Sequence, residues 1–314
     1  MELRVEGVHK KFNEKQVLHD ISFSVSSGQA LGLLGRNGAG KTTTLRILTD
    51  IFQADSGEIR LNGAPIDRGQ INMGYLPEER GLYPKSKVGE QMIYIGRLKG
   101  LSADAAKKRA MDLLEELEAA EHWSKKLETL SKGNQQKIQL AIAVIQDPEI
   151  IILDEPFSGL DPVNAKILKQ MISRQADKDK IVIFSSHQMP YVEEFCQHIC
   201  ILNKGRIVLD GLIREIRKTW LRNRIAVSPE EDPDIFLARA ARHENWPRVV
   251  TQTFRRGETL EIILKDPADK QCLYTLLAEL DTGIDSFSVV EPTLEEIFVR
   301  ANEENDGEGG GVHE

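Results

Sequence analysis

The sequence predicts an α/β protein that carries a second, smaller α+β domain. Three short apolar runs, in QALGLLG, EIIILDEP and KIVIFSSH, have the composition of strands buried in a parallel sheet. Segments with helical spacing of apolar residues alternate with such runs up to about residue 210. After about residue 215 the expected order becomes strand, helix, strand, strand, helix, strand, which is typical of the ferredoxin-like arrangement.

The expected elements divide the chain into three parts. Residues 1–212 form the α/β core, with a helix-rich subdomain at about 85–146 that contains ADAAKKRAMDLLEELEAA. Residues 213–301 begin with a basic connecting helix, IREIRKTWLRNR, and end with a closing helix, TLEEIFVRA. Between them lie the strands RIAVS, RVVTQTF, TLEIIL and IDSFSVV and the helices PDIFLARAARH and DKQCLYTLLAEL. Residues 302–314, NEENDGEGGGVHE, are expected to be a disordered acidic tail.

Composition excludes several classes of protein. The formal net charge of -8 gives no electrostatic case for binding nucleic acid. The chain has no uncharged apolar stretch of about 18 residues, and its first residues lack a signal-peptide core, so we expect a cytoplasmic protein. Three cysteines are too few for a disulfide framework. The segment CQHIC, with Cys196, His198 and Cys200, could bind a metal, but it fits a helix–strand junction with core cysteines better.

The strongest functional motif is GRNGAGKT, which fits G-x-x-x-x-G-K-[ST] between an expected strand and an expected helix. Glycines let the backbone fold around a phosphate, while exposed amides and the positive helix end face the anion. Lys41 is expected to reach the β- and γ-phosphates, and the Thr42 hydroxyl suits Mg²⁺. The predicted nucleotide contacts in this loop are Gly35, Arg36, Asn37, Gly38, Ala39, Gly40, Lys41, Thr42 and Thr43.

Two further motifs follow expected strands. In IIILDEP, four apolar residues place Asp154 and Glu155 at the carboxyl end of a strand, where ligands bind in open α/β sheets. Asp154 is expected to hold Mg²⁺ through water, and Glu155 to polarise the attacking water. In SSHQ, His187 ends the next strand and could contact the γ-phosphate. Alone, the carboxylates could be solvated and the histidine could be an ordinary surface residue. The turn SGLD, residues 158 to 161, lies shortly after Glu155.

The stretch LSKGNQQK, residues 130–137, precedes the apolar run IQLAIAVIQ. Ser131 can cap a helix there, so the residues by themselves predict only a helix start.

Taken together, the order of these motifs resembles the nucleotide-binding subunits of ATP-binding-cassette (ABC) transporters over residues 1 to about 212. The resemblance makes GRNGAGKT the Walker A motif, LSKGNQQK the signature, IIILDEP the Walker B motif, SGLD the D-loop and His187 the switch histidine. It implies ATP and Mg²⁺ as ligands. It also places Phe12 where the family stacks an aromatic ring on adenine, although a core phenylalanine remains an alternative.

In this family the signature loop contacts the ATP held by the other cassette of a head-to-tail dimer. Ser131 and Gly133 of that loop are present here, whereas Lys132 and Asn134 replace a glycine and a glutamine. A lysine beside a triphosphate is favourable, so we interpret LSKGNQQK as a working variant. Its cost would be backbone strain if position 132 required a positive φ. A second departure is Glu78, which stands where most of the family has a glutamine that touches Mg²⁺. A glutamate there can still bind Mg²⁺, but it loses the amide donor.

The segments LPEERGLYP and PTLEEIFVRA resemble motifs of a bacterial exporter subgroup that includes sodium and antibiotic exporters. The resemblance implies an ATPase subunit, most simply a homodimer, that drives a separate membrane permease from the inner face of the membrane. Ser131 of one cassette and Lys41 of the other would stabilise charge. The alternatives are a soluble ABC ATPase acting on ribosomes or nucleic acid, and an ATP-dependent regulator. This chain has one cassette, no coiled coil and no basic face, and it keeps Glu155 and His187.

Overall fold

The computed structural model describes residues 1–308 except 68, 80, 220–222 and 281; residues 309–314 lie outside the described part. The chain divides into two compact units. One contains Met1–Ile213 together with the chain from Arg300 onward, and the other contains Arg214–Val299. Among the described residues, no helix combines the length and the apolar character that a membrane span requires.

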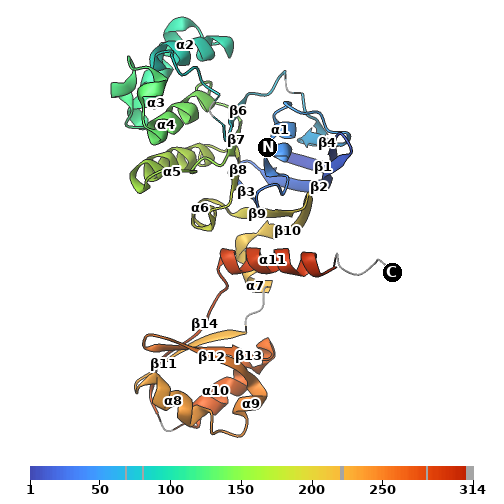
Figure 1. The fold of residues 1–314 in the computed structure, drawn as a ribbon, viewed down its shortest axis with the longest axis vertical. Coiled ribbons are helices and arrows are strands. Elements are labelled where there is room, and N and C mark those ends of the chain that lie inside the picture. The colour runs from blue at the N-terminus through green and yellow to red at the C-terminus, as the bar shows by residue number, and fades with distance from the viewer. Residues whose placement is uncertain (68, 80, 220–222, 281, 309–314) are drawn as a thin grey trace. The chain divides into compact units, whose positions relative to one another are not determined.

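The first unit is built on a six-stranded sheet whose order, within the described residues, is β10-β9-β3-β8-β7-β6 (Figure 1). The pairs from β9 to β6 are parallel, and β10 is antiparallel to β9. Every residue of β3, β7 and β8 is buried, as expected for a parallel sheet covered on both faces. The strands are β3 (Ala30–Gly35), β6 (Met73–Leu76), β7 (Ile150–Asp154), β8 (Ile181–Ser186), β9 (His198–Asn203) and β10 (Arg206–Leu212).

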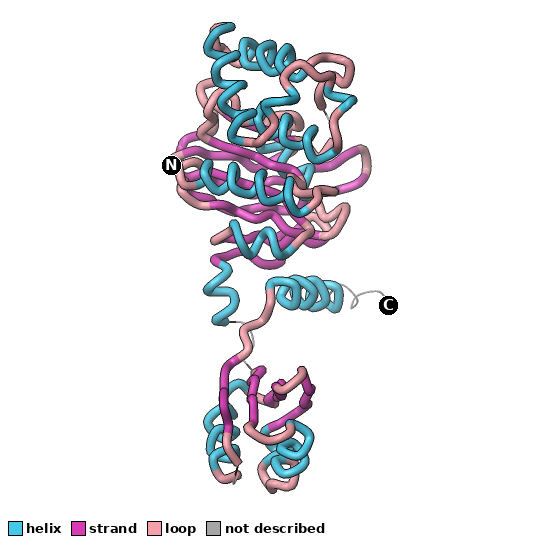
Figure 2. The backbone as a smooth tube through the Cα atoms, turned by 90° about the vertical axis from the view of Figure 1, so that its left-hand side faces the viewer, coloured by secondary structure: helices cyan, strands magenta, loops and turns pink. Residues whose placement is uncertain are grey.

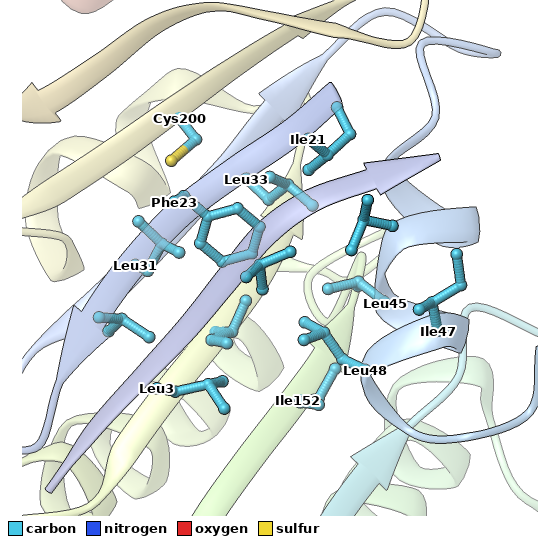
Figure 3. Close-up of a cluster of buried hydrophobic side chains, with 14 of the residues drawn as sticks. Leu3, Ile21, Phe23, Leu31, Leu33, Leu45, Ile47, Leu48, Ile152 and Cys200 are labelled. Atoms are coloured by element: carbon cyan, nitrogen blue, oxygen red, sulfur yellow. The ribbon is translucent and has the colours of Figure 1, made fainter. Parts of the chain in front are cut away.

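A second sheet in this unit has the described order β2-β1-β4-β5. Its strands are β1 (Glu2–Phe12), β2 (Lys15–Ser26), β4 (Ser56–Leu61) and β5 (Ala64–Pro65). The main hydrophobic core lies between the two sheets and helix α1 (Lys41–Leu48) (Figure 3). Leu3 and Phe23 come from one sheet, Leu31 from the other and Leu45 from the helix. This core fixes the start of α1 against the end of β3.

Between β6 and β7 the chain forms a helical subdomain, which lies beyond the strands at the top of Figure 2. It contains α2 (Val88–Leu98), α3 (Ala103–Glu116) and α4 (Lys132–Ala143), with short 3-10 turns at Ala120–His122 and Leu127–Thr129. Helices α5 (Pro162–Ala176) and α6 (Met189–Phe195) follow β7 and β8. Asp161 caps α5 through the amides of Val163 and Asn164, and Pro162 occupies its first position.

The second unit has the described sheet order β12-β13-β11-β14, with every pair antiparallel. Counted along the chain this order is 2-3-1-4, which confirms the predicted ferredoxin-like arrangement. Figure 1 shows α8, α9 and α10 on one side of this sheet. The elements are β11 (Arg224–Pro229), α8 (Pro233–Ala240), α9 (Trp246–Val249), β12 (Val250–Arg256), β13 (Thr259–Leu264), a 3-10 turn (Pro267–Asp269), α10 (Lys270–Ala278) and β14 (Ile284–Val289).

Two sequence-based boundaries differ from the structure. The connecting helix α7 covers only Ile213–Thr219, residues 220–222 lie outside the described part, and Arg224 already begins β11. The closing helix α11 runs over Leu294–Glu308, so residues 302–308 are helical and not disordered as predicted. Asn302 is only 1% exposed, and its carbonyl accepts a bond from Asn203 Nδ2 at 3.5 Å. The acidic composition concealed this tertiary contact. The rest of the predicted tail, residues 309–314, lies outside the described residues.

Truncation within α11 should therefore destabilise the first unit. A chain that ends after Arg300 loses buried Ala301 and Asn302, whereas a chain that ends after Glu308 keeps them. We expect the shorter chain to melt about 2–4 °C lower for each kcal/mol lost, and the longer one to melt like the full chain. Thermal unfolding followed by circular dichroism checks this. Equal midpoints for all three chains would show that the contact at Asn302 contributes nothing.

Candidate functional site

The predicted phosphate loop connects β3 to α1. Arg36, Asn37 and Gly38 at its tip are exposed, whereas Ala39 and Gly40 are buried against the protein. Helix α1 begins at Lys41 and continues through Thr42 and Thr43, so its free amides face the loop. The positive end of the helix and the exposed tip together suit an anion.

Gly40 requires a glycine because of its backbone conformation. Its φ is 110°, and a Cβ there would lie 2.6 Å from Cδ2 of buried Leu18. Gly38 also has a positive φ, 79°. A side chain at Gly40 would be strained and would displace the loop from the core.

Lys41, Glu155 and His187 form a chain of contacts at the loop. Lys41 Nζ donates to the Gly35 carbonyl at 2.8 Å and lies 3.7 Å from Glu155 Oε1. The other carboxylate oxygen, Glu155 Oε2, lies 2.9 Å from His187 Nδ1. Lys41 and Glu155 are almost fully buried, while the His187 side chain is half exposed. A phosphate on the loop would therefore meet a buried ammonium group beside a carboxylate that is oriented by a histidine.

Asp154 lies next to this chain of contacts and is fully buried. Its Oδ1 accepts bonds from Ser185 Oγ at 2.6 Å and from Thr42 Oγ1 at 3.4 Å. Its Oδ2 is buried and has no hydrogen-bond partner within the described part of the chain. A carboxylate oxygen without a partner beside a threonine hydroxyl provides the hard oxygen ligands that Mg²⁺ prefers. The residues present therefore fit Mg²⁺.

Glu78 follows β6, the strand beside β7, and is exposed. No hydrogen bond or ion pair joins it to the described Asp154 or Thr42. The charge of Glu78 nevertheless affects the nearby Tyr75 hydroxyl. Burial raises the pKa of this hydroxyl, and the carboxylates of Asp154 and Glu78 raise that pKa further. Glu78 thus adds negative charge at the strand ends.

Phe12 ends β1, and its side chain is on the surface with 38% exposed. Its ring meets Phe52 edge-on, with 5.2 Å between the ring centroids, and Lys10 Nζ lies 5.5 Å from its centroid. This exposure rules out the core alternative and leaves an aromatic surface on which a base can stack.

The signature residues lie on the helical subdomain and not at the phosphate loop. Ser131 caps α4 through the amide of Asn134 at 3.4 Å. In the part of the chain that the structure describes, no hydrogen bond or ion pair joins Ser131 to Lys41 or Glu155. Lys132 is the first residue of α4 and does not have a positive φ, so the expected strain at this position is absent. The constrained position is Gly133, where a Cβ would lie 2.6 Å from Asn164 Nδ2.

Further residues, which are not among the predicted site residues, hold these groups in place. Ser185 accepts the Glu155 amide at 3.0 Å and donates to Asp154. Gln136, in the signature helix, donates to the Pro156 carbonyl at 3.1 Å. Asn164, beside Gly133, donates to Asp161 at the end of the D-loop. Ser185 carried a detectable signal, because a serine inside an apolar strand run must find a polar partner.

The segment CQHIC forms the predicted helix–strand junction, with both cysteines buried. His198 Nε2 and Cys200 Sγ both contact Asp210 Oδ1, at 2.6 and 2.9 Å. Burial raises the pKa of the Cys200 thiol well above its usual value, which keeps it protonated. The three groups satisfy one another by hydrogen bonds.

A phosphate loop at a strand–helix junction, with paired carboxylates and a histidine at neighbouring strand ends, defines a P-loop nucleotide hydrolase. Comparison with known proteins specifies the family. The family model described as "ABC transporter" matches residues 18–158, and the model for the C-terminal domain of DrrA1-3-like ATP-binding proteins matches residues 211–301.

Whole-length relatives agree with these matches. The ABC transporter ATP-binding protein YhaQ of Bacillus subtilis is 37% identical over 95% of this chain and 97% of its own length. The linearmycin resistance ATP-binding protein LnrL of the same species is 31% identical over the same shares. A Nod factor export ATP-binding protein I of Ralstonia nicotianae is 34% identical over 68% of each chain.

Solved structures share the fold. The ATP-binding subunit of an ABC transporter superposes with a TM-score of 0.64 and 29% identity, over 70% of this chain and 93% of its own. A dimeric bacterial ABC transporter cassette gives a TM-score of 0.62 at 22% identity, over 68% and 99%. This chain belongs to the ATP-binding proteins of ABC transporters. It binds ATP and is an ATPase that powers a membrane permease. The comparisons support this function over the alternatives of a soluble ATPase acting on ribosomes or nucleic acid and of an ATP-dependent regulator.

Replacing Glu155 by glutamine should separate binding from turnover. The amide keeps the size of the side chain, and Lys41 keeps its bond to Gly35. We expect ATP affinity to be retained and kcat to fall about 10²–10⁴-fold, the usual contribution of a positioned base. ATP-binding fluorescence and phosphate release check the two quantities. A Glu155→Gln protein with the wild-type rate would remove Glu155 from the role of base.

Replacing Glu78 by glutamine should have a different effect. The change removes a negative charge near Tyr75, so the pKa of the tyrosine should shift down, which ultraviolet titration against a Tyr75→Phe control can follow. Basal ATP hydrolysis should survive because, among the described residues, no hydrogen bond or ion pair joins Glu78 to Asp154 or Thr42. Stimulation by the permease should change. Collapse of the basal rate would make Glu78 an indispensable ligand.

Proposed function

We propose that this chain is the ATPase subunit of an exporter that works as a head-to-tail homodimer on a separate membrane permease. Each of its two sites holds MgATP between the Walker A loop of one copy and the signature helix of the other. Binding closes the dimer, and hydrolysis opens it again. The subunit acts at the inner face of the cell membrane through the permease.

Export as the direction of transport is supported by the named relatives. A resistance protein and a Nod factor export protein resemble this chain, and the first of them does so over nearly its whole length. The C-terminal unit matches the DrrA1-3-like model, as does the exporter-type ending of the chain. One structural neighbour is described as a dimeric cassette, which supports the dimer.

The composite site is supported by one observation above all. Five predicted residues gather at the strand ends, whereas Ser131 and Gly133 lie at the start of α4, and no hydrogen bond or ion pair within the described part of the chain joins them to the five. The five are Lys41, Thr42, Asp154, Glu155 and His187. Ser131 and Lys132 are exposed at the start of α4. A hydroxyl, a lysine and free amides at a helix start suit a phosphate, which a second copy would supply.

Within this site each residue has a distinct task. Lys41 binds the terminal phosphates, and the amides of the loop hold their oxygens. Thr42 and Asp154 would hold Mg²⁺, which neutralises phosphate charge when it is bound. Glu155 orients the attacking water and receives its proton, and His187 fixes that carboxylate through Nδ1. Phosphoryl transfer depends mainly on such positioning and charge stabilisation.

Mixing two inactive variants tests whether the signature acts across the dimer. Lys41→Ala and Ser131→Arg should each be inactive alone. In a mixed dimer both defects fall in one site, and the other site is intact. The mixture should therefore regain part of the ATPase rate, or of ATP-driven dimerisation if hydrolysis requires both sites. Absence of rescue in both assays, with subunit exchange verified, would contradict a signature that acts in trans.

A double variant supplies the matched control. Wild-type protein mixed with excess Lys41→Ala/Ser131→Arg chain places one defect in each site if the loops act in trans, so the ATPase rate should be suppressed. Loops acting within one chain would leave one intact site in that mixed dimer. The two mixtures thus respond in opposite directions under the two arrangements.

A further inference from the structure

We propose that Ser185 is a positioning residue for the MgATP site, which sets both carboxylates of the Walker B turn through one hydroxyl group. The inference rests on the proposed role of Asp154 as a Mg²⁺ ligand. Ser185 would then have two effects. It presents one oxygen of Asp154 to the cation, and it holds the backbone turn that orients the Glu155 side chain.

The hydrogen bonds at Ser185 have only one possible direction. The Glu155 amide can only donate, so it donates to Ser185 Oγ at 3.0 Å. The hydroxyl proton is then available for Asp154 Oδ1, 2.6 Å away. Alanine can make neither bond, and the thiol of cysteine makes both weakly. The hydroxyl therefore connects the two residues as an acceptor on one side and a donor on the other.

The sheet places this hydroxyl between the two groups. Strands β7 and β8 are parallel, and Asp154 lies opposite Ser185 in their register. Both residues are 0% exposed, so water cannot replace the bond between them. With Oδ1 occupied by Ser185 and Thr42, Oδ2 remains the oxygen without a partner. The bond thus fixes the carboxylate rotamer that leaves Oδ2 for a cation.

The same hydroxyl supports a strained turn. Glu155 has a φ of 49°, a conformation that residues other than glycine adopt at a cost. Its amide bond to Ser185 holds the backbone in that conformation, which directs the carboxylate to Lys41 and His187. Loss of the bond would let the turn relax and change the position of the attacking water.

A matched control is available one residue away. Ser186 lies on the same strand and is 2% exposed, but its hydroxyl accepts the Gln188 amide at 3.0 Å and not the Walker B turn. Ser186→Ala therefore removes a buried hydroxyl without removing the Asp154 and Glu155 bonds. Ser185→Thr keeps the hydroxyl, and Ser185→Cys keeps a side chain of similar size.

The test measures the affinity for a fluorescent ATP analogue with Mg²⁺ and with EDTA, together with kcat. For Ser185→Ala we expect the affinity in EDTA to stay within about twofold and the gain in affinity from Mg²⁺ to shrink about tenfold, as loss of a buried charged hydrogen bond predicts. The value of kcat should fall by a similar factor. Ser185→Cys should behave like Ser185→Ala, and Ser185→Thr should recover most of both quantities.

Three outcomes would overturn the proposal. A Mg²⁺ gain and kcat equal to those of Ser186→Ala would show that the hydroxyl does not act on the site. Equal loss of affinity with and without Mg²⁺ would show general damage to the fold, which Ser185→Cys would check if Ser185→Ala does not fold. Failure of Ser185→Thr to rescue would exclude the hydroxyl as the cause. A wild-type protein without any Mg²⁺ gain would instead contradict the proposed metal site itself.

Discussion

The site depends on the parallel alignment of β3, β7 and β8 in one buried sheet. This pairing brings the end of β3, where the phosphate loop starts, to the same edge as Asp154 and Ser185. The strands are buried on both faces, so their register is fixed by the core on either side. A slip of one residue in β7 would turn Asp154 away from Thr42 and Ser185. Lys41, Glu155 and His187 contact one another because this edge places them together.

The site residues at this strand edge could largely be predicted from the sequence, because they lie in short motifs at the ends of apolar runs. GRNGAGKT, IIILDEP and SSHQ each follow such a run, and parallel strands end at one edge. The order of the C-terminal elements likewise predicted the ferredoxin-like sheet of the second unit. Contacts between distant segments could not be predicted. The Asn203 bond to Asn302 depends on tertiary packing. So does the sheet that contains β1 and β2, whose pairing is interrupted by register shifts.

In the signature loop, the residue that departs from the family pattern is not the one that is sterically constrained. The replacement of a glycine by Lys132 is harmless to the backbone, since this residue simply begins α4 without a positive φ. The glycine that matters sterically is Gly133, which packs against Asn164 near the D-loop. Gln136 in turn donates a hydrogen bond to the carbonyl of Pro156, the residue directly after Glu155. The helix that we propose to contact the partner's nucleotide is thus hydrogen-bonded to the turn that carries Glu155 in its own chain.

Asp154 and Thr42 should hold the cation at this strand edge, and Glu155 should face the attacking water. A crystal structure of the chain with Mg²⁺ and a non-hydrolysable ATP analogue checks these positions. We expect the cation at Thr42 Oγ1 and on the Oδ2 side of Asp154. We also expect the terminal phosphate on Lys41, with Ser131 of a second copy across it. A cation bound away from Asp154, or a terminal phosphate contacted by Ser131 of the same copy, would show that these residues do not have the proposed roles.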